Sequence, residues 1–590
     1  MAHLEAAHQL GVDPLDYCAH RFGLGETLVA QRAADWAGLT FFPAMPSGGQ
    51  SRIEIGRVDR LGEIQAIRMP LGGRDIVFVA PRFDKLLRLS LLRDARPDLH
   101  TRIAIVPGSA IRSELAALAR QPMMEAARHR LVRQWPRAAG HVDAPKPARI
   151  GFVLLLITVL LVVTLAPWLS PVLFLPLVSV VLLLPAALRL AAALTRPGEQ
   201  RPVRPLGDDE LPVYTVLLPL RDEAHMVGQL AAALRLIDYP PEKLDIKFVV
   251  ETRSLATVAA VQRQLHDPRF ELVLVPDALP RTKPKALNYA LPFVRGEYLA
   301  VYDAEDLPEP GQLRLAASTF AARPDLMCLQ AELVIDNARD GLLPALFAGE
   351  YAGQFGLMLP LLVRLGWPMP LGGTSNHFRV GALKAVGGWD PFNVTEDADL
   401  GVRLARLGLK TATIPSHTGE EAPIRLGPWL RQRTRWMKGW MQTIIVHNRD
   451  WRALKRDLGW GGFLGLHLYI GSLLLSAPLH TAFLISLGVS LLTLEAPFGH
   501  GWVGVLAGLV FALGYLGPAL LVVAGLTRLK RRDLLPAQLL LPVYWVLHGV
   551  AMVLAARELI SNPFAWAKTT HGETRTGRGA VKRRRRAHVE

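Results

Sequence analysis

The sequence has very little cysteine. Its 590 residues include only Cys18 and Cys328, which lie far apart along the chain. Two distant cysteines cannot form the disulfide framework of a small secreted protein, and they are typical of a reducing compartment. The N-terminus also lacks a basic segment followed by an apolar core, so no signal peptide is recognisable. We therefore expect the beginning of the chain to stay in the cytoplasm.

Acidic residues are scarce relative to basic ones. The chain has 67 Lys and Arg against 51 Asp and Glu, which gives a formal net charge of +16. Such an excess suits nucleic acid, an anionic lipid surface or an anionic substrate. The sequence has no helix-turn-helix, zinc-finger or RNA-binding motif, which argues against nucleic acid as a partner.

Long apolar runs distinguish the sequence from that of a soluble enzyme. Two runs at 151–170 and 171–194 predict a pair of transmembrane helices within 150–195, and basic residues on both flanks indicate that both ends lie inside. Apolar sequence resumes at Gly461 and forms a long run that Pro478 interrupts. About four crossings are expected within 460–557. An even total returns the basic tail, 558–590, to the cytoplasm. If 461–494 were a single span, the tail would lie outside.

The sequence between these two groups of runs is typical of an α/β domain. Residues 205–455 alternate apolar strands with helical segments, and the predicted strands are 213–220, 246–251, 271–276 and 298–306. This alternation favours a mostly parallel sheet covered by helices. Residues 1–145 predict a separate small α/β unit, with strands at 76–81 and 102–107.

Carboxylates after the last of these strands form a candidate metal site. Asp303, Glu305 and Asp306 follow an apolar segment directly. Ligands of open α/β sheets bind at the carboxyl ends of the strands, where carboxylates can hold Mg²⁺ or Mn²⁺ and leave positions for phosphate oxygens. A solvated acidic turn is the alternative interpretation.

A second acidic motif, Thr395-Glu396-Asp397, precedes an amphipathic helical segment. One interpretation makes Thr395 or Asp397 a helix N-cap. The other makes Asp397 a general base, because adjacent negative charge raises the proton affinity of a carboxylate.

A basic stretch with several tryptophans, 429–443, lies close to the next apolar run. As a helix it places its tryptophans near one stripe, which suits an interfacial helix with snorkelling cations and an aromatic belt. The other interpretation assigns Arg433 and Arg435 to a diphosphate, whose oxygens match a planar guanidinium, and Trp436 to the face of a sugar.

The order of these motifs, D-A-E-D, then T-E-D, then Q-R-T-R-W, resembles the family 2 glycosyltransferases and, among them, processive membrane synthases such as bacterial cellulose synthase. The resemblance covers about 210–460. It implies a GT-A type α/β domain, with a mostly parallel sheet, inserted between transmembrane helices. The basic stretch then ends this domain, 205–455, as an interfacial helix.

The resemblance also implies a role for individual residues. Asp397 matches the catalytic base, with Glu396 beside it, and the metal ligands are Asp303 with Glu305 or Asp306, since Glu305 stands where the family has Asp. The nucleotide sugar is expected to contact Glu223, Glu251, Lys285, Arg433 and Arg435. The family commonly has Tyr-Asn-Glu where this chain has Arg-Asp-Glu at 221–223, so the base contact is less defined.

The acceptor is expected to contact Gln432 and Trp436, and His377 is a further candidate for acceptor or metal. The alternative for His377 is a packed loop histidine. A stretch after the last apolar run resembles the mobile gating loop of cellulose synthases, with Trp566, Thr569 and His571 as candidates. An interfacial anchor is the alternative for that stretch.

The resemblance, together with the hydropathy pattern, implies an inverting, metal-dependent enzyme of a bacterial inner membrane, with its catalytic domain and both termini cytoplasmic. It would polymerise a UDP-sugar, with glucose favoured, into a β-linked glucan and export the growing polysaccharide through the same chain, in contact with membrane lipid. One rival is a non-processive enzyme that adds a single sugar to a lipid or protein. Another is a non-enzymatic receptor with a degenerate domain, which the intact motifs disfavour.

The N-terminal unit, 1–145, weakly resembles the N-terminal domain of type II secretion ATPases. Some of these domains bind cyclic di-GMP, but no convincing version of that motif is present in this sequence. The hypotheses for this unit are therefore a regulator, acting through cyclic di-GMP or a regulatory protein, and a simple packing domain.

Overall fold

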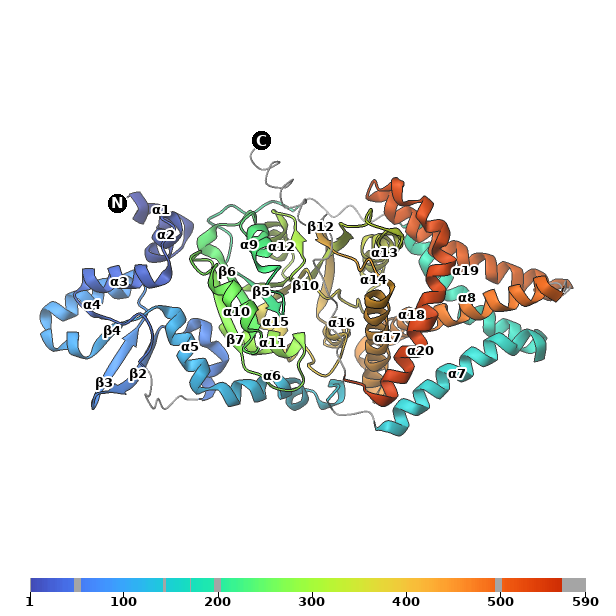
Figure 1. Ribbon diagram of the computed structural model, residues 1–590, viewed down its shortest axis with the longest axis horizontal. Helices are drawn as coiled ribbons and strands as arrows, with labels where there is room; N and C mark the ends of the chain where they lie inside the picture. The colour runs from blue at the N-terminus through green and yellow to red at the C-terminus, as the bar shows by residue number, and fades with distance from the viewer. Residues whose placement is uncertain are drawn as a thin grey trace.

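The computed structural model describes residues 2–46, 55–141, 145–169, 171–195, 203–493 and 501–564. Figure 1 shows three parts in a row: the N-terminal unit, a central α/β domain, and long helices that project from the far side of that domain. The chain therefore has the arrangement that its hydropathy pattern predicts.

The N-terminal unit is a small α/β structure. Its sheet has the order β1 (Thr40–Phe41), β4 (Ile103–Ile105), β3 (Arg74–Val79) and β2 (Ala66–Leu71), with only the β2–β3 pair antiparallel. Six helices accompany the sheet, namely α1 (Ala2–Leu10), α2 (Pro14–Arg21), α3 (Glu26–Ala37), α4 (Phe83–Ala95), α5 (Gly108–Leu118) and α6 (Arg120–Gln134). Both strands expected in this unit are present.

This unit docks on the central domain through buried polar contacts. The guanidinium of Arg112, on α5, donates to both carboxylate oxygens of Glu271 at 2.8 and 2.9 Å, and Lys247 reaches the same carboxylate at 2.5 Å. Asn288 of the central domain donates to the carbonyl oxygen of Ala127, on α6, at 3.0 Å. Because a buried charge is costly without a partner, Arg112 and Glu271 tie the two parts together.

The central domain is built on an eight-stranded sheet. The strands are β7 (Phe270–Val275), β6 (Leu244–Glu251), β5 (Tyr214–Leu220), β8 (Tyr298–Val301), β11 (Asn376–Arg379), β10 (Leu326–Ile335), β12 (Lys410–Glu420) and β9 (Leu307–Pro308), in that spatial order. The four predicted strands, β5 to β8, pair in parallel, whereas β11 is antiparallel to both neighbours. Their carboxyl ends therefore share one edge of the sheet.

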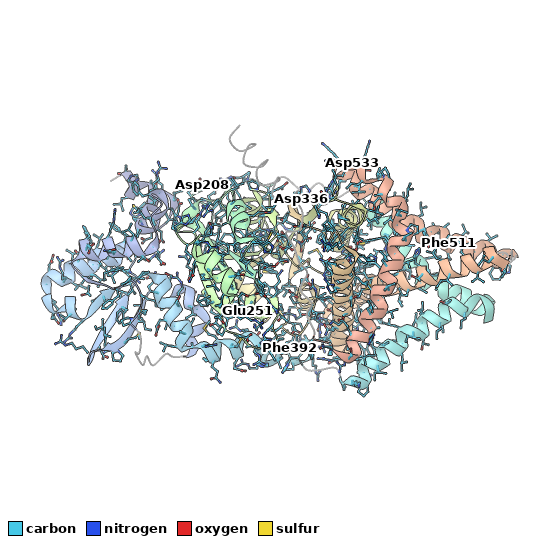
Figure 2. All side chains as sticks on the ribbon, in the orientation of Figure 1. Asp208, Glu251, Asp336, Phe392, Phe511 and Asp533 are labelled. Carbon is cyan, nitrogen blue, oxygen red and sulfur yellow. The ribbon has the colours of Figure 1, made fainter. Side chains whose placement is uncertain are left out.

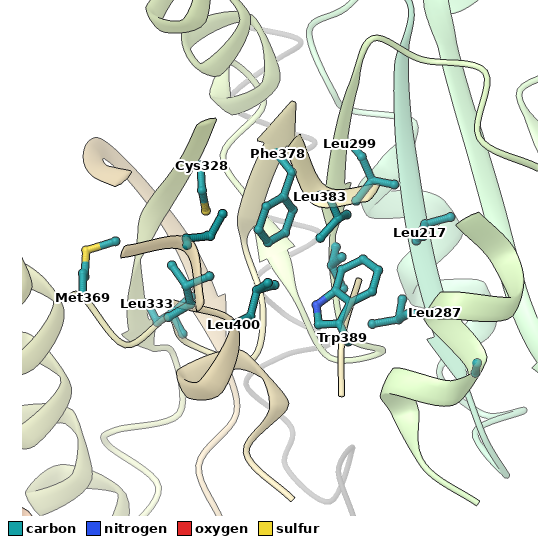
Figure 3. Packing of buried hydrophobic residues seen from close by; sticks show 14 of the residues in the cluster. Leu217, Leu287, Leu299, Cys328, Leu333, Met369, Phe378, Leu383, Trp389 and Leu400 are labelled. Atoms are coloured by element: carbon teal, nitrogen blue, oxygen red, sulfur yellow. The ribbon is translucent and has the colours of Figure 1, made fainter. Parts of the chain in front are cut away.

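Both faces of this sheet are covered. Successive residues of β5 alternate between two hydrophobic clusters, with Val216 and Leu218 in one and Leu217 in the other, as expected for a strand between two helical layers. Figure 3 shows part of the second cluster, which also contains Leu299 and Trp389. The covering helices are α9 (Val227–Leu234), α10 (Leu255–Gln262), α11 (Lys283–Ala290), α12 (Gln312–Ala322), α15 (Val380–Ala385) and α16 (Glu396–Arg406).

Four described segments are long and apolar enough to cross a membrane by length and composition: Leu342–Arg364, Trp451–Val489, Gly504–Arg528 and Arg532–Ser561. The first comprises α13 (Leu342–Gly353), a π-helical turn (Gln354–Met358) and α14 (Leu359–Arg364), and 78% of its apolar window is buried in the protein. Two further apolar helices, α7 (Lys146–Leu169) and α8 (Pro171–Leu194), match the predicted N-terminal pair.

The prediction of two helices within 461–495 is wrong. A single helix, α18, runs over Trp451–Thr493 with Pro478 inside it, and its only break in helical geometry is at Gly459. Proline is tolerated in apolar helices because neighbouring side chains and helices compensate for the lost hydrogen bond. In the described part of 460–557, three helices therefore replace the expected four: α18, α19 (Gly501–Arg528) and α20 (Leu541–Ser561).

The last helix lies along the basic helix α17 (Leu426–Asn448). Near its start, Tyr544 accepts a hydrogen bond from Trp429 at 3.3 Å, and near its end Glu558 accepts one from Lys438 at 2.8 Å. Both ends of α20 therefore contact the same helix of the central domain. The other long helices, α7 with α8 and α18 with α19, project away from that domain in Figure 1.

Candidate active site

One cavity brings together most of the predicted site residues. It has a volume of about 250 Å³ and lies at the carboxyl ends of β5, β6 and β8, between the sheet, α13 and α17. Its lining includes these predicted residues: Glu223, Glu251, Asp303, Glu305, Glu396, Asp397, Gln432, Arg433, Arg435 and Trp436. Residues more than 200 positions apart in the sequence thus form one site.

Lys283 and Asp303 form an ion pair on the wall of this cavity. The Lys283 ammonium contacts the Asp303 carboxylate and donates to the carbonyl oxygen of Gly373 at 2.6 Å. Burial disfavours the charged ammonium, but Asp303, Glu396 and Asp306 outweigh burial and raise the pKa of Lys283. A permanent positive charge therefore lies at the floor of the site, where an anion can bind.

The structure distinguishes Glu305 from Asp306. Asp306 is 1% exposed, and one of its oxygens accepts from the Asp303 amide at 2.6 Å and from the Thr374 hydroxyl. Burial and the charge of Asp303 raise the pKa of Asp306 to about 8. Glu305 lines the cavity beside Asp303, and burial and the charges of Asp303 and Asp306 raise its pKa well above the usual range. Asp303 and Glu305 are thus the carboxylates that face the cavity.

The two carboxylates of the T-E-D motif lie in the first turn of α16, where the helix dipole favours negative charge. Burial and the charge of Asp397 raise the pKa of Glu396 to about 8. Burial also raises the pKa of Asp397, although its oxygen accepts from the Ala398 amide at 2.8 Å. With a pKa of about 8, Glu396 therefore holds its proton at neutral pH.

Glu223 and Glu251 form the end of the cavity beside β5 and β6. Glu223 accepts from the Arg221 amide at 3.1 Å, and its own amide donates to Thr257 at 3.0 Å. One oxygen of Glu251 is 3.1 Å from the Lys285 ammonium, whereas the other is buried without a hydrogen-bond partner. Lys285 itself is 0% exposed and is not part of the cavity wall, so it holds Glu251 from behind while Lys283 takes the position facing the cavity.

The residues of the Q-R-T-R-W motif face the cavity from α17 but differ in their surroundings. Arg433 is 2% exposed, pairs with Glu350 at 2.6 Å and lies 4.5 Å from the Trp436 ring centre. Arg435 donates to the Val394 carbonyl oxygen at 3.3 Å, next to the T-E-D motif. The side-chain oxygen of Gln432 is buried without a hydrogen-bond partner. Arg435 is thus the arginine nearest the reacting carboxylates, and Arg433 fixes the packing of Trp436.

Tryptophans of α17 do not form an exposed aromatic belt. Trp429 is 0% exposed and packs against Tyr544 and His548 of α20, while Trp436 and Trp440 line the cavity. Sequence periodicity alone places these rings on a stripe but does not reveal that α20 covers it.

His377 does not belong to the site. It lies on β11 with 0% exposure, and its ring nitrogens are 2.7 Å from the Tyr214 hydroxyl and 3.2 Å from Gln312. Burial lowers the pKa of His377 to about 3. The expected contact with acceptor or metal is therefore wrong, and the alternative of a packed histidine holds. The three candidates of the gating loop, Trp566, Thr569 and His571, lie outside the described residues.

Sequence motifs missed two walls of the cavity. Glu350, Tyr351 and Gln354 come from the buried apolar segment 342–364, and Tyr469 comes from α18. A carboxylate and an amide within a run of apolar residues are a signal in the sequence, because polar groups in apolar helices are usually functional. A Cβ at Gly372 would lie 2.9 Å from the Phe355 ring, so glycine allows a close approach at this position.

The charge distribution of the cavity suits a divalent cation and a diphosphate. Carboxylates outnumber cations on its wall, and burial together with neighbouring carboxylates raises the pKa values of Glu305 and Glu396. Asp303 and Glu305 can supply two oxygen ligands, which leaves further positions to phosphate oxygens and water. No three metal-binding side chains form a complete cage within the described residues.

The sequence of this chain is similar to those of known glycosyltransferases. Residues 298–555 match the family model described as glycosyl transferase family group 2. The chain is 26% identical over 257 residues to the probable glycosyltransferase YdaM of Bacillus subtilis (strain 168), which is 42% of this chain and 60% of that protein. It is 25% identical over 264 residues to a beta-monoglucosyldiacylglycerol synthase of Synechocystis sp., which is 44% and 54% of the two chains.

A third relative is cellulose synthase 1 of Komagataeibacter xylinus, with 27% identity over 285 residues, or 46% of this chain and 18% of that protein. The chain thus spans less than two thirds of the length of each of these relatives. Among solved structures, the mannosyltransferase PcManGT from Pyrobaculum calidifontis, in complex with GDP-Man and Mn²⁺, covers 64% of this chain and 98% of its own, with 21% identity and a TM-score of 0.39.

Proposed function

We propose that the chain carries a family 2 glycosyltransferase domain of the GT-A type, and that it is an inverting, metal-dependent hexosyltransferase that polymerises a UDP-sugar into a β-linked polysaccharide. The match of residues 298–555 to the family model supports this proposal. The observation that carries the proposal is the single cavity in which Asp303, Asp397 and Arg435 line the same space. Each of these groups is required by one part of the reaction.

The donor binds with its diphosphate between the acidic and basic walls. Glu223 and Glu251 contact the nucleoside, and the diphosphate lies near Lys283 and Arg435. Asp303 and Glu305 would hold Mg²⁺ or Mn²⁺, which supplies charge neutralisation for the leaving diphosphate when bound. Lys283 would then release Asp303 and turn to a phosphate oxygen, since both contacts satisfy its charge.

Asp397 removes the proton from the acceptor hydroxyl. The hydroxyl oxygen attacks the anomeric carbon from the face opposite the diphosphate, the carbon–oxygen bond to the diphosphate breaks, and the configuration inverts. Glu396 keeps its proton at neutral pH because its pKa is raised to about 8, so it adds no second negative charge near the donor. Arg435 stabilises the diphosphate as it leaves.

The acceptor binds beyond Asp397, against α17. Gln432 has a free oxygen for a sugar hydroxyl, and the Trp436 ring, held by Arg433, offers a flat apolar face. Tyr469 and Leu473 of α18 extend the cavity toward the apolar helices. This continuity supports repeated addition of glucose and passage of the product into the membrane, which is the processive form of the proposal.

The arrangement of the helices supports a cytoplasmic catalytic domain. If α7 with α8 and α18 with α19 cross the inner membrane as two hairpins, and α20 stays along α17, the number of crossings is four. Both termini then lie on the side of the catalytic domain, as expected from the basic tail. The N-terminal unit lies on that same side, where a cyclic di-GMP or protein regulator could reach it.

A single-addition enzyme with a lipid acceptor is the second candidate. It is favoured by a second cavity between the apolar helices, which shares Glu350 and Trp440 with the catalytic cavity. A lipid in that cavity would bring its head group to the site without a channel for polymer.

The test is incubation of the purified chain with radiolabelled UDP-glucose or UDP-GlcNAc and Mg²⁺ or Mn²⁺. A long product that linkage-specific β-glucanases digest supports processive synthesis, whereas a product of one added sugar in the lipid fraction supports the second candidate. If the protein transfers sugar from none of these donors, and Asp397→Asn responds to ligands as the wild type does, a non-enzymatic receptor is favoured.

A further inference from the structure

The second cavity has a volume of about 690 Å³ and lies among α8, α18, α19 and α20. Most of its wall is apolar, and it shares four lining residues with the catalytic cavity: Glu350, Gln354, Trp440 and Leu473. Figure 2 places Phe511, another lining residue, on the projecting helices, well away from Glu251 in the central domain. The cavity therefore connects the catalytic site with the apolar part of the chain.

An arginine lies on the wall of this apolar cavity. Arg189 is on α8, five residues before the helix ends at Leu194. Its guanidinium contacts three neutral oxygens at long distances, the hydroxyls of Ser472 at 3.5 Å and Ser476 at 3.4 Å and the Pro185 carbonyl at 3.4 Å. Within the described residues no carboxylate lies within 4.0 Å of it, whereas Arg528, at the end of α19, pairs with Glu332.

A guanidinium among apolar helices requires a counter-charge or access to water. Ionisable residues in such helices are rare and usually mark a ligand or ion site. Arg189 is directed toward α18 and the cavity, as its two serine contacts show, and its fork of donors matches phosphate oxygens.

We propose that this cavity binds a lipid whose head group carries a phosphate, with the phosphate on Arg189, Ser472 and Ser476. The acyl chains lie against the apolar walls of α8, α18 and α19. The head group continues past Trp440 and Gln354 into the catalytic cavity. The role of this lipid as glycosyl acceptor rests on the second candidate function, the single addition of a sugar to a lipid, whereas its binding does not.

The spacing along α18 agrees with this arrangement. Tyr469 lines the catalytic cavity and Ser476 contacts Arg189. Seven residues separate them, which is about 10 Å along a helix at 1.5 Å per residue. A lipid head group can bridge this distance, so its terminal hydroxyl can reach the catalytic cavity while its phosphate stays on Arg189.

The test measures lipid binding to the full-length protein by native mass spectrometry after detergent extraction, without any nucleotide sugar. The probes are phosphatidylglycerol, a diacylglycerol with the same acyl chains, and inorganic phosphate as competitor. The variants are Arg189→Gln, Arg189→Lys and the pair Ser472→Ala with Ser476→Ala. Arg557→Gln is the matched control, because Arg557 is an exposed arginine on α20.

Arg189→Gln is expected to weaken phosphatidylglycerol binding by about tenfold, because hydrogen bonds to a charged group are lost. Arg189→Lys and the serine pair should weaken it less, and Arg557→Gln should leave it unchanged. Diacylglycerol should bind about as weakly to the wild type as phosphatidylglycerol does to Arg189→Gln. These results together support a site for a phosphate-bearing lipid.

Equal binding of the two lipids, or wild-type affinity in both Arg189→Gln and the serine pair, overturns the proposal. Displacement of the lipid by inorganic phosphate overturns it as well, because the site would then take the free anion. The serine pair keeps the charge of α8 and so guards against a folding defect in Arg189→Gln. Absence of sugar transfer in a wild type that binds the lipid contradicts the proposed function and leaves the lipid site intact.

Discussion

Replacement of Asp397 by asparagine tests the centre of the mechanism. Asparagine has almost the same shape and keeps an oxygen for the Ala398 amide, which donates to Asp397 at 2.8 Å, so the fold should be preserved. It cannot accept the proton of the acceptor hydroxyl. Loss of a general base lowers kcat by about 10²- to 10⁴-fold, which is ~3–5 kcal/mol in the activation barrier. KM for the donor should change little, because Glu223, Glu251 and Arg435 are untouched.

The assay is the initial rate of incorporation of labelled sugar at saturating donor, with the thermal unfolding temperature as a check on folding. Glu396→Gln is the matched control, because it removes the neighbouring carboxylate and mimics its protonated form. Near pH 7 this variant should retain most of the activity. If Asp397→Asn keeps its full kcat while Glu396→Gln loses it, the two carboxylates have been assigned the wrong way round.

The pH dependence of the same pair sharpens the test. Glu396 loses its proton near pH 8, so above that pH the wild type gains a negative charge beside the diphosphate. Donor KM should therefore rise above pH 8 in the wild type and stay flat in Glu396→Gln. The raised pKa of Asp397 also means that activity falls on its acidic side at a higher pH than an ordinary aspartate would give. Identical KM profiles for wild type and Glu396→Gln would refute the assignment of the proton.

Three further predictions concern the surroundings of the site. Asp303→Asn should raise the concentration of Mg²⁺ or Mn²⁺ needed for half-maximal activity by about tenfold or more, whereas Asp306→Asn should mainly lower the unfolding temperature. The reverse pattern in a metal titration would contradict the placement of Asp303 at the cavity and of Asp306 behind it. His377→Ala should lower the free energy of unfolding by about 2 kcal/mol and leave KM for the acceptor unchanged, because the ring is buried among polar partners; a selective change in acceptor KM would return it to the site. Burial opposes ionisation of Glu271, but Arg112 and Lys247 lower its pKa to about 2. The ionised carboxylate therefore contributes ~3 kcal/mol to the free energy of unfolding at pH values above its unfolded-state pKa, near 4.5. This contribution is lost as the pH falls through about 2. Glu271→Gln should therefore make the N-terminal unit less resistant to proteolysis at pH 7. Equal cleavage of the wild type and Glu271→Gln would contradict a role of Glu271 in docking this unit.

The strands of the central domain were predictable because a buried parallel strand is a nearly continuous apolar run. This pattern gave β5 to β8 and, through their shared edge, the position of Asp303 at the same edge of the sheet as Glu251. The antiparallel β11 lies between two strands that are distant in sequence, and no local pattern indicates such an insertion. Topology of this kind depends on tertiary contacts.

Hydropathy predicted that the terminal helices are apolar but not how they lie. Pro478 looked like a boundary, yet packing keeps α18 continuous. The run that forms α20 is apolar enough to cross a membrane, yet it contacts α17 at both ends, through Tyr544 and Glu558. Composition measures the average environment of a helix, whereas these contacts depend on a few polar side chains.

Among the site residues, the local motif predicted the position of a side chain correctly where that side chain lines the cavity. It failed where the packing of a neighbouring element determines which side chain faces the cavity. Lys283 and Lys285 are two positions apart in the same helical turn, and only the first reaches Asp303. Which of the two faces the site depends on the packing of α11 against β6, which the sequence does not display.

The docking of the N-terminal unit has a practical consequence for anyone who wishes to shorten the chain. Removing residues before the first apolar helix would uncover the back of α11, where Asn288 is held by Ala127, and would leave Glu271 and Lys247 without the guanidinium that completes their arrangement. The opposite end of α11 carries Lys283, which reaches the sugar-transfer chamber. A truncated chain would thus lose rigidity at Lys283, and measurements on it would not represent the intact protein.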